Sequence, residues 1–350
     1  MSHALLYCAG GGIGDSLVAS VVARALRSKY TRVDALTLPG HRGTLERVPD
    51  IDTVLVDDGS DDALVAALLH ERSYDACVVT WATARTARIP QLAQIPVRVG
   101  QARRLYSGRF TKRVTVRSET GDVTSPWVDI LLDYARAIGC DTADRNPRFV
   151  PTHADREAAA VLLSELRERL AGRDAYVILH PTNAIASKRG NWPTAGWAAL
   201  ARSLAAHFDR AVLVSGAPAD AAINERIVRE AGDGRVVDVA GKLSIGAFGA
   251  LAAQADAFVG ITTGTMHVAA AVGAPTTGIF PFQTDFPERW GPAGARTAVV
   301  RASYPCHGGD TKETCADYAC IANLDIPRII ATVESLLGEP HARDDSALHV

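Results

Sequence analysis

Short apolar segments alternate with helical patterns along most of this chain, and this alternation is the feature that most limits its fold. Runs such as ALLYCAG (4–10) and DACVVTW (75–81) have the length and composition of buried strands. Between them lie segments such as DSLVASVVARALRSKY (15–30), whose apolar residues recur at helical spacing. Regular alternation of strand and helix is typical of βαβ units around a parallel sheet. The sequence therefore predicts the α/β class.

The alternation restarts near residue 175, where AYVILHP (175–181) begins a second series of strands and helices. A chain of 350 residues exceeds what one hydrophobic core usually organises. We therefore predict two Rossmann-like domains, with ligands bound in the cleft at the carboxyl ends of the strands. The predicted parts are an N-terminal domain (1–152), a linker helix (153–172), a C-terminal domain (173–337) and a polar tail (338–350).

Charge and hydropathy exclude two classes of protein. The net charge of −2 argues against a dedicated nucleic-acid binder, which would be strongly basic. No apolar run approaches the ~20 residues that span a bilayer, and no signal-peptide pattern opens the chain. We therefore expect a cytoplasmic protein.

A glycine-rich turn, CAGGGIGDSL (8–17), follows the first predicted strand. Its glycines do not have the GxGxxG spacing of a dinucleotide site, and no Lys-Ser/Thr pair of a Walker loop follows them. The turn still lets backbone approach a ligand closely. Asp15 then begins the helix, where its carboxylate is either a helix cap or a general base that faces the cleft.

Two further loops follow strands of the second series. In HPTNAIASKRGNWP (180–193), Lys188 is placed to meet a phosphate, or it is an ordinary solvated lysine. In GITTGTMHVAAAVGAP (260–275), a strand leads through Thr263 into a helix of small residues. The N–H groups at such a helix start form an anion site, unless the helix is simply capped by threonine. His267 in its first turn donates to the same anion or is a buried imidazole.

Possible metal ligands are few in the sequence. Cys306, Cys315 and Cys320 cluster near the carboxyl end beside His307, but their spacing matches no CxxC pair of a zinc site. The only Asp-x-Asp spacing, Asp50 and Asp52, is better explained as a turn that enters a strand. We therefore predict no metal site and no cofactor.

A basic stretch, QARRLYSGRFTKRVTVR (101–117), contains Arg103, Arg104, Arg109 and Lys112. Guanidinium groups bind carboxylates and phosphates in bidentate fashion, so the stretch suits an acidic saccharide or glycolipid acceptor. It also suits peripheral contact with an anionic membrane surface, whereas the alternative is a solvated basic loop.

The ordered combination of GGIGDSL, KRGNWP, TTGTMHVAAAVGAPTTGIF and the late PC…C…C pattern resembles the glycosyltransferase family 9 heptosyltransferases over residues 4–337. The resemblance implies a GT-B fold: two Rossmann-like domains facing across a cleft, with the acceptor on the first and the nucleotide sugar on the second. It implies an inverting glycosyltransferase of lipopolysaccharide biosynthesis, with ADP-heptose as donor and a saccharide or lipopolysaccharide core as acceptor. Since no Asp-x-Asp metal site is expected, we predict a metal-independent reaction.

Residue by residue, the resemblance assigns the general base to Asp15 and the cation on the donor diphosphate to Lys188. The predicted donor-binding set is Thr182, Asn183, Ser187, Lys188, Gly216, Asp220, Thr262, Thr263, Gly264, Thr265, Met266 and His267. The predicted acceptor-binding set is Gly12, Gly14, Asp15, Arg103, Arg104, Arg109 and Lys112.

One position departs from the family pattern. Thr262 stands where the family usually has Asp before Thr-Gly, so another sugar or another nucleotide is an alternative. Two other functions also stay open: a nucleotide-sugar epimerase with two Rossmann domains, and a noncatalytic sugar-nucleotide binding protein. The epimerase would act on the donor alone, and the binding protein would not need Asp15.

Overall fold

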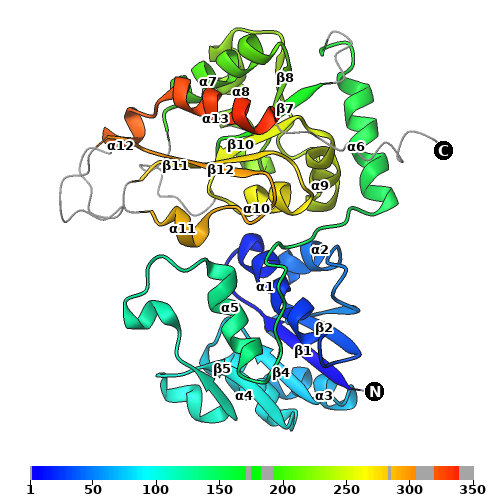
Figure 1. Cartoon of the computed structure of the whole chain (residues 1–350). Helices are drawn as coiled ribbons and strands as arrows, with labels where there is room; N and C mark the ends of the chain where they lie inside the picture. Colours follow the sequence, from blue (N-terminus) through cyan, green and yellow to red (C-terminus); the bar gives the residue numbers. More distant parts are fainter. Residues whose placement is uncertain (1, 171–174, 183–191, 283–284, 305–318, 339–350) are drawn as a thin grey trace. The chain divides into compact units, whose positions relative to one another are not determined.

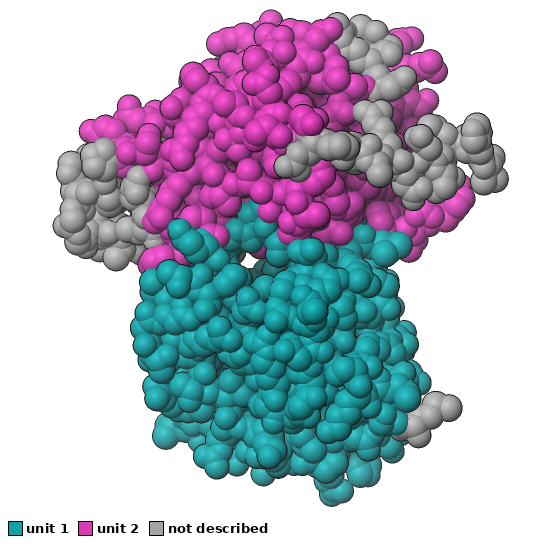
Figure 2. Space-filling view, in the orientation of Figure 1, with its two compact units in different colours: residues 1–150, 288–293 teal, residues 151–287, 294–350 magenta. Residues whose placement is uncertain are grey.

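The computed structural model describes residues 2–170, 175–182, 192–282, 285–304 and 319–338. The chain divides into two compact units (Figures 1 and 2). The first contains residues 1–150 and 288–293, and the second contains residues 151–287 and 294–350. The sequence analysis placed the boundary at 152 and a linker helix after it. In the structure that helix, α6 (His153–Leu166), packs on α9 (Ile245–Gln254) within the second unit.

The first unit is built on a parallel sheet of six strands. The strands are β1 (His3–Cys8), β2 (Arg32–Thr37), β3 (Thr53–Val56), β4 (Ala76–Val79), β5 (Val97–Gln101) and β6 (Lys112–Val114). Its helices are α1 (Ile13–Leu26), α2 (Arg42–Leu45), α3 (Asp62–Glu71), α4 (Ala84–Leu92), α5 (Trp127–Arg136) and, from its second residue on, the short α11 (Pro287–Trp290). The 3₁₀ turns are η1 (Pro39–His41), η2 (Leu105–Arg109) and η3 (Arg117–Thr120).

Strand β1 explains how the sequence builds this unit. All six of its residues are buried, as is typical of a central parallel strand covered on both faces. Leu5 and Tyr7 contribute to a core cluster with residues of α3 and α4. Because side chains alternate along a strand, Leu6 and Cys8 point to the opposite face of the sheet. Helices α1 and α5 pack on each other in this unit.

The second unit repeats this plan with another six-stranded parallel sheet. The strands are β7 (Tyr176–His180), β8 (Ala211–Val214), β9 (Val236–Asp238), β10 (Ala257–Ile261), β11 (Thr276–Phe280) and β12 (Thr297–Arg301). Besides α6 and α9, its helices are α7 (Thr194–Phe208), α8 (Ala221–Ala231), α10 (Gly264–Ala271), α12 (Ala319–Ala322) and α13 (Ile326–Leu337), with the 3₁₀ turn η4 (Pro218–Asp220). Trp197 of α7 and Val333 of α13 lie in one buried cluster with Leu179 of β7.

The two sheets have the same strand order. It is β3-β2-β1-β4-β5-β6 in the first unit and β9-β8-β7-β10-β11-β12 in the second. This is the doubly wound 3-2-1-4-5-6 order, whose topological switch point lies between its first and fourth strands. The order therefore directs attention to the loops after β1 and β4, and to those after β7 and β10. The predicted α/β class with two Rossmann-like units is confirmed.

Some elements were not anticipated. The basic stretch 101–117 contains the end of β5, the turn η2 and the edge strand β6.

No helix within the described ranges is long and apolar enough to cross a membrane.

Candidate active site

The glycine turn after β1 is shaped by the side chains around it. A Cβ on Gly10 would lie 2.0 Å from Cδ1 of Trp81, so the indole ring rests directly on the turn's backbone. Gly11 has a φ of +67°, and a Cβ there would lie 2.4 Å from the Asp15 carboxylate. Only glycine adopts such a backbone without strain. The turn therefore makes room for two side chains, Trp81 and Asp15.

Asp15 is the third residue of α1, and its carboxylate turns back to the start of the helix. Its Oδ2 accepts a hydrogen bond of 2.7 Å from the backbone N–H of Gly12. This bond fixes the side chain, and the N-terminus of the helix favours its negative charge. The cap that the sequence suggested is therefore present. A cap bond occupies one carboxylate oxygen and leaves acceptor capacity for a substrate hydroxyl.

Burial raises the pKa of Asp15 above its ordinary value of 3.8. The Gly12 N–H and the nearby His41 act in the opposite direction and are outweighed. A carboxylate with a raised pKa is a stronger base than an exposed one, which suits proton abstraction. Asp15 thus combines a fixed position with increased basicity.

His41, at the end of η1, is a neighbour that the sequence analysis did not single out. Its Nδ1 lies 2.8 Å from Oγ of Ser16, the residue after Asp15. Burial lowers the pKa of His41, although the charge of Asp15 works against this shift. His41 is therefore a hydrogen-bonding group near the carboxylate, and burial favours its neutral form.

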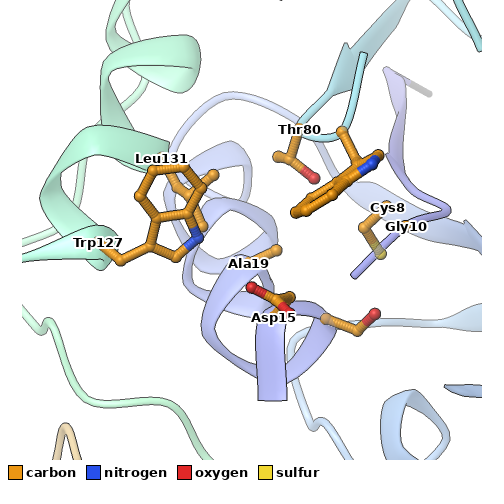
Figure 3. A pocket seen from close by; sticks show the side chains of 9 residues that line it. Cys8, Gly10, Asp15, Ala19, Thr80, Trp127 and Leu131 are labelled. Carbon is orange, nitrogen blue, oxygen red and sulfur yellow. The ribbon is translucent and has the colours of Figure 1, made fainter. Parts of the chain in front are cut away.

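A small pocket opens beside Asp15 (Figure 3). Figure 3 shows Trp127 and Leu131 of α5 on one side of Asp15, and Cys8 and Gly10 on the other. Among the described residues, the pocket is lined by Cys8, Gly10, Asp15, Ser16, Ala19, Thr80, Trp81, Trp127 and Leu131. None of these residues is Lys, Arg or His. Thr80 and Trp81 follow β4, so the pocket lies at the switch point of the first sheet.

Trp127 is supported by a segment distant in the sequence. Its ring lies 4.8 Å, centroid to centroid, from the ring of Trp290 in α11. The guanidinium of the adjacent Arg289 donates to the backbone carbonyl of Asp122. These contacts attach residues 288–293 to the first unit. No sequence pattern links the two tryptophans, because their contact depends on the folded chain alone.

The basic residues of 101–117 lie away from this pocket lining. Arg104 forms an ion pair with Glu119, while Arg103 and Lys112 are exposed. Arg109 uses its backbone carbonyl to accept a hydrogen bond from Arg98. The structure therefore brings Gly12, Gly14 and Asp15 together at the turn, but places the four cations of the acceptor set elsewhere in the first unit.

Those predicted donor residues that the structure describes gather at the carboxyl edge of the second sheet. Gly260 of β10 pairs in register with His180 of β7, so Thr262 and Thr182 each lie two residues beyond paired positions. Leu179 of β7 pairs with Val214 of β8, which brings the Gly216 loop to the same edge. Within this unit, Thr182 after β7 and Thr262 after β10 therefore lie at the switch point of the sheet, and Gly216 after β8 lies at the same edge.

The start of α10 is not capped by a side chain. Thr263 occupies the N-cap position, but it makes no capping hydrogen bond. Its hydroxyl instead lies 2.8 Å from the hydroxyl of Thr265. The N–H groups of the first helical turn have no partner within the helix and point towards its N-terminal end. The simple Thr-capped helix, which was the alternative to an anion site, is thus not what forms.

Two other predicted donor residues have buried polar atoms. Nδ1 of His267 and Oγ1 of Thr182 have no hydrogen-bond partner among the described residues. Burial lowers the pKa of His267 to about 4, so its imidazole is neutral at pH 7. Met266, beside it, is fully buried and serves the core.

Asp220 is held in the turn η4 that follows β8. Its Oδ2 accepts a hydrogen bond of 2.7 Å from the N–H of Ala217. A Cβ on Gly216 would lie 2.9 Å from Cβ of Asp220, so the glycine permits close approach of this turn. Burial lowers the pKa of His180 to about 4, although the negative charge of Asp220 acts in the opposite direction.

Part of the predicted site lies outside the described residues, namely Asn183, Ser187, Lys188, Cys306, His307 and Cys315. Within the described ranges, no three His, Cys, Asp or Glu side chains come together as metal ligands. Asp50 and Asp52 are engaged with Arg24 and Arg27 at the turn before β3. The turn that the sequence suggested for this pair is therefore observed.

Comparison with known proteins places this chain among enzymes that transfer sugars. A family model described as Glycosyltransferase family 9 (heptosyltransferase) matches residues 64–318. A Haemophilus influenzae protein named "Putative glycosyltransferase" is 22% identical over 292 residues, which cover 80% of this chain and 83% of that protein.

Two solved structures show the same fold. The ADP-heptose lipopolysaccharide heptosyltransferase II of E. coli superposes with a TM-score of 0.75 at 18% identity, covering 96% of this chain and 98% of that one. A family 9 glycosyl transferase from Veillonella parvula superposes with a TM-score of 0.79 at 17% identity, covering 95% and 97%.

Proposed function

This chain belongs to glycosyltransferase family 9, and from that premise we propose that it transfers a heptose from an ADP-linked donor to a saccharide or lipopolysaccharide-core acceptor. The enzyme class follows from the family. The donor sugar, the nucleotide and the acceptor are parts of the proposal. They are supported by the shared fold of the E. coli ADP-heptose lipopolysaccharide heptosyltransferase II. The observation that carries the proposal furthest is the fixed, partly buried carboxylate of Asp15 at a switch point.

We propose direct displacement with inversion at the anomeric carbon. The acceptor hydroxyl attacks that carbon while its proton passes to the Asp15 carboxylate, and the bond from the anomeric carbon to the diphosphate oxygen breaks. A positioned base of raised pKa contributes about 10²–10⁴-fold to such a step. Because the attacking oxygen replaces the leaving oxygen from the opposite face, the configuration inverts.

The leaving diphosphate gains charge as the bond breaks, and the second unit supplies groups for it. The uncapped N–H groups at Thr263, Gly264 and Thr265 are oriented before reaction. Lys188, which lies outside the described residues, is proposed as the cation on the same diphosphate. We propose that the reaction needs no metal ion and no cofactor beyond the nucleotide sugar.

The remaining assignments are also proposals. Thr182, Gly216, Asp220 and His267 line the donor side. The basic residues of 101–117 contact acidic groups of the acceptor or an anionic membrane surface at the cytoplasmic face. Charge complementarity supports this second assignment.

The test is a transfer assay with ADP-heptose and a lipopolysaccharide-core saccharide, followed by NMR of the product's anomeric proton. We expect a new glycosidic bond of inverted configuration, formed equally well in excess EDTA. Retained configuration, or loss of activity in EDTA that a divalent ion restores, would overturn the mechanism. Isomerisation of the donor without acceptor would identify an epimerase. Donor binding without any turnover would identify a binding protein.

A further inference from the structure

Leu105 has the most exposed large apolar side chain among the described residues. It begins the turn η2, and its exposed fraction is 106%, so neighbouring residues do not cover it. A single exposed leucine is common on protein surfaces, so its meaning depends on the structure around it. Two features distinguish Leu105: the turn that carries it is firmly held, and cations accompany it along the chain.

The turn η2 is fixed by hydrogen bonds to two other segments of the first unit. Oγ of Ser107, which is buried, donates a bond of 2.6 Å to the carbonyl of Gln101 at the end of β5. The hydroxyl of Tyr106 donates a bond of 2.6 Å to the carbonyl of Ala82, in the loop before α4. These bonds direct Tyr106 and Ser107 into the unit. The turn therefore presents Leu105 to the solvent instead of covering it.

The backbone on either side of the turn is also held. Arg103 has a φ of +60°, which is uncommon for a residue with a Cβ. Such a conformation persists where the surrounding structure imposes it. After the turn, Phe110 is buried over Gly100, where a Cβ would lie 2.3 Å from its ring. The exposure of Leu105 is thus a property of a well-packed turn.

Positive charge accompanies Leu105 along the chain. The stretch 101–117 contains no Asp or Glu. Arg104 of this stretch pairs with Glu119, and Arg117 pairs with Asp133. The other cations of the stretch have no ion-pair partner in the part of the chain that the structure describes; they are Arg103, Arg109, Lys112 and Arg113.

Two simpler explanations account for only part of this arrangement. Lys112 and Arg113 lie on the edge strand β6, where charges discourage pairing with another chain. A solvated basic loop would also expose its cations. Neither explanation calls for a fully exposed leucine on a fixed turn. A partner with an anionic surface and an apolar interior accounts for both the cations and the leucine.

We propose that η2 docks the first unit on an anionic lipid bilayer, with Leu105 inserted below the head groups and the neighbouring cations on the lipid phosphates. Binding at a bilayer surface increases with the apolar area buried and with the attraction to anionic lipids. An acidic saccharide, the other ligand considered for this stretch, offers Leu105 no apolar environment. The inference rests on the proposed function for a lipid-linked acceptor, but docking itself can be measured without sugar transfer.

The experiment is co-sedimentation of the full chain with lipid vesicles. One set contains phosphatidylcholine alone, and the other is an equimolar mixture of phosphatidylcholine and phosphatidylglycerol. We expect the chain to bind the anionic vesicles at least about tenfold more tightly than the neutral ones, because several cations act together. Added salt should weaken this binding by screening the charges.

Variants separate the two contributions. Leu105→Ser should weaken binding to anionic vesicles about tenfold, as expected when one leucine is no longer buried. Lys112→Gln should weaken it about fivefold, which is the effect of one cation near the surface. Val161→Ser is the matched control, because it removes an exposed apolar side chain from α6 of the second unit and should change nothing.

Two results would overturn the inference. One is equal binding to neutral and anionic vesicles, or binding to neither. The other is wild-type binding by both Leu105→Ser and Lys112→Gln, with circular dichroism showing that they are folded. If a soluble phosphorylated saccharide binds and no vesicle does, the stretch belongs to the acceptor instead. The failure of the proposed function has a different signature: a chain that docks on anionic vesicles as expected and transfers no sugar.

Discussion

The two units have the same strand order, yet the loops at their switch points carry different chemistry. In the first unit, the loops after β1 and β4 supply a carboxylate and an indole ring. In the second, the loops after β7 and β10 supply hydroxyls and the uncapped start of a helix. A common scaffold thus fixes where a ligand binds, whereas the loop sequences decide what it is.

The electrostatic difference between the two units agrees with the roles that we propose for them. Burial makes Asp15 of the first unit more basic and His267 of the second less basic. A base is needed where the acceptor loses a proton. A neutral imidazole and free N–H groups are suited to a departing diphosphate, which they contact without exchanging a proton.

The largest effect is expected at Asp15. In Asp15→Asn, the amide oxygen can still accept the Gly12 N–H, so the turn keeps its shape. Transfer should fall by about 10²–10⁴-fold, because the base is lost. Donor affinity, measured by calorimetry, should stay at the wild-type level. Near wild-type turnover in this variant would contradict the assignment of Asp15 as the general base.

The same variant should not lose stability. Because burial raises the pKa of Asp15, the folded chain binds a proton more readily than the unfolded chain. Its ionisation therefore lowers the free energy of unfolding as pH rises through this window. Asp15→Asn abolishes that loss, so its melting temperature at pH 7 should equal or exceed the wild-type value. A clear decrease would mean that the carboxylate is mainly a cap.

The next effect concerns the glycine turn. Gly10→Ala introduces a methyl group 2.0 Å from the Trp81 ring, which must move. Acceptor KM should rise about tenfold, as for the loss of one aromatic contact. Gly12→Ala is the matched comparison, because its Cβ meets nothing closer than 3.8 Å. Equal changes in the two variants would show that the position of Trp81 is unimportant.

A smaller effect distinguishes two helix starts in the second unit. Ser244 caps α9 by accepting the N–H of Ala247, whereas Thr263 caps nothing. Ser244→Ala should lower the free energy of unfolding by about 1 kcal/mol with donor affinity unchanged. Thr263→Val should weaken donor binding about fivefold with little loss of stability. Denaturant titration and calorimetry separate the two outcomes, and the reverse pattern would contradict the donor assignment.

The last effect concerns stability alone, as a dependence on pH, and leaves transfer unchanged at pH 7. Burial lowers the pKa of His180 from 6.5 to about 4, although Asp220 opposes the shift. Between these values the unfolded chain binds a proton that the folded chain does not. The free energy of unfolding should therefore fall on acidification by at most about 1.4 kcal/mol per pH unit from this group. His180→Asn, which can still bond to Ser215, should flatten the urea midpoint profile from pH 6.5 to 4.5. Parallel profiles of the wild type and the variant would show that His180 does not cause the loss of stability on acidification.

Much of the fold could be predicted because the central strands are recognisable in the sequence as buried apolar segments. Strands β1 and β10 are continuous apolar runs, and the sequence analysis found both. The edge strands β6 and β12 were missed, because one-sided exposure lets them carry Lys112 and Arg301.

The sequence predicted the candidate site only where its residues lie close together along the chain. The turn at Asp15 and the turn at Thr263 each lie within one short segment, so their patterns could be read. The pairing of Asp15 with Trp127 joins two elements that are distant in the chain, and no spacing rule reports such contacts. Trp81 is an intermediate case: it ends a predicted strand, and the switch-point rule would have placed it beside the glycine turn.

Residues 288–293 have a consequence for dissecting the protein. The chain leaves the first unit after residue 150 and returns for this short segment, which brings Trp290 against Trp127. A single cut near residue 150 therefore does not yield two self-sufficient halves. A fragment that ended there would leave one face of Trp127 uncovered. Chimaeras that exchange the second unit between relatives should keep the native 288–293 segment together with residues 1–150, because this segment lies within the sequence of the second unit but packs with the first.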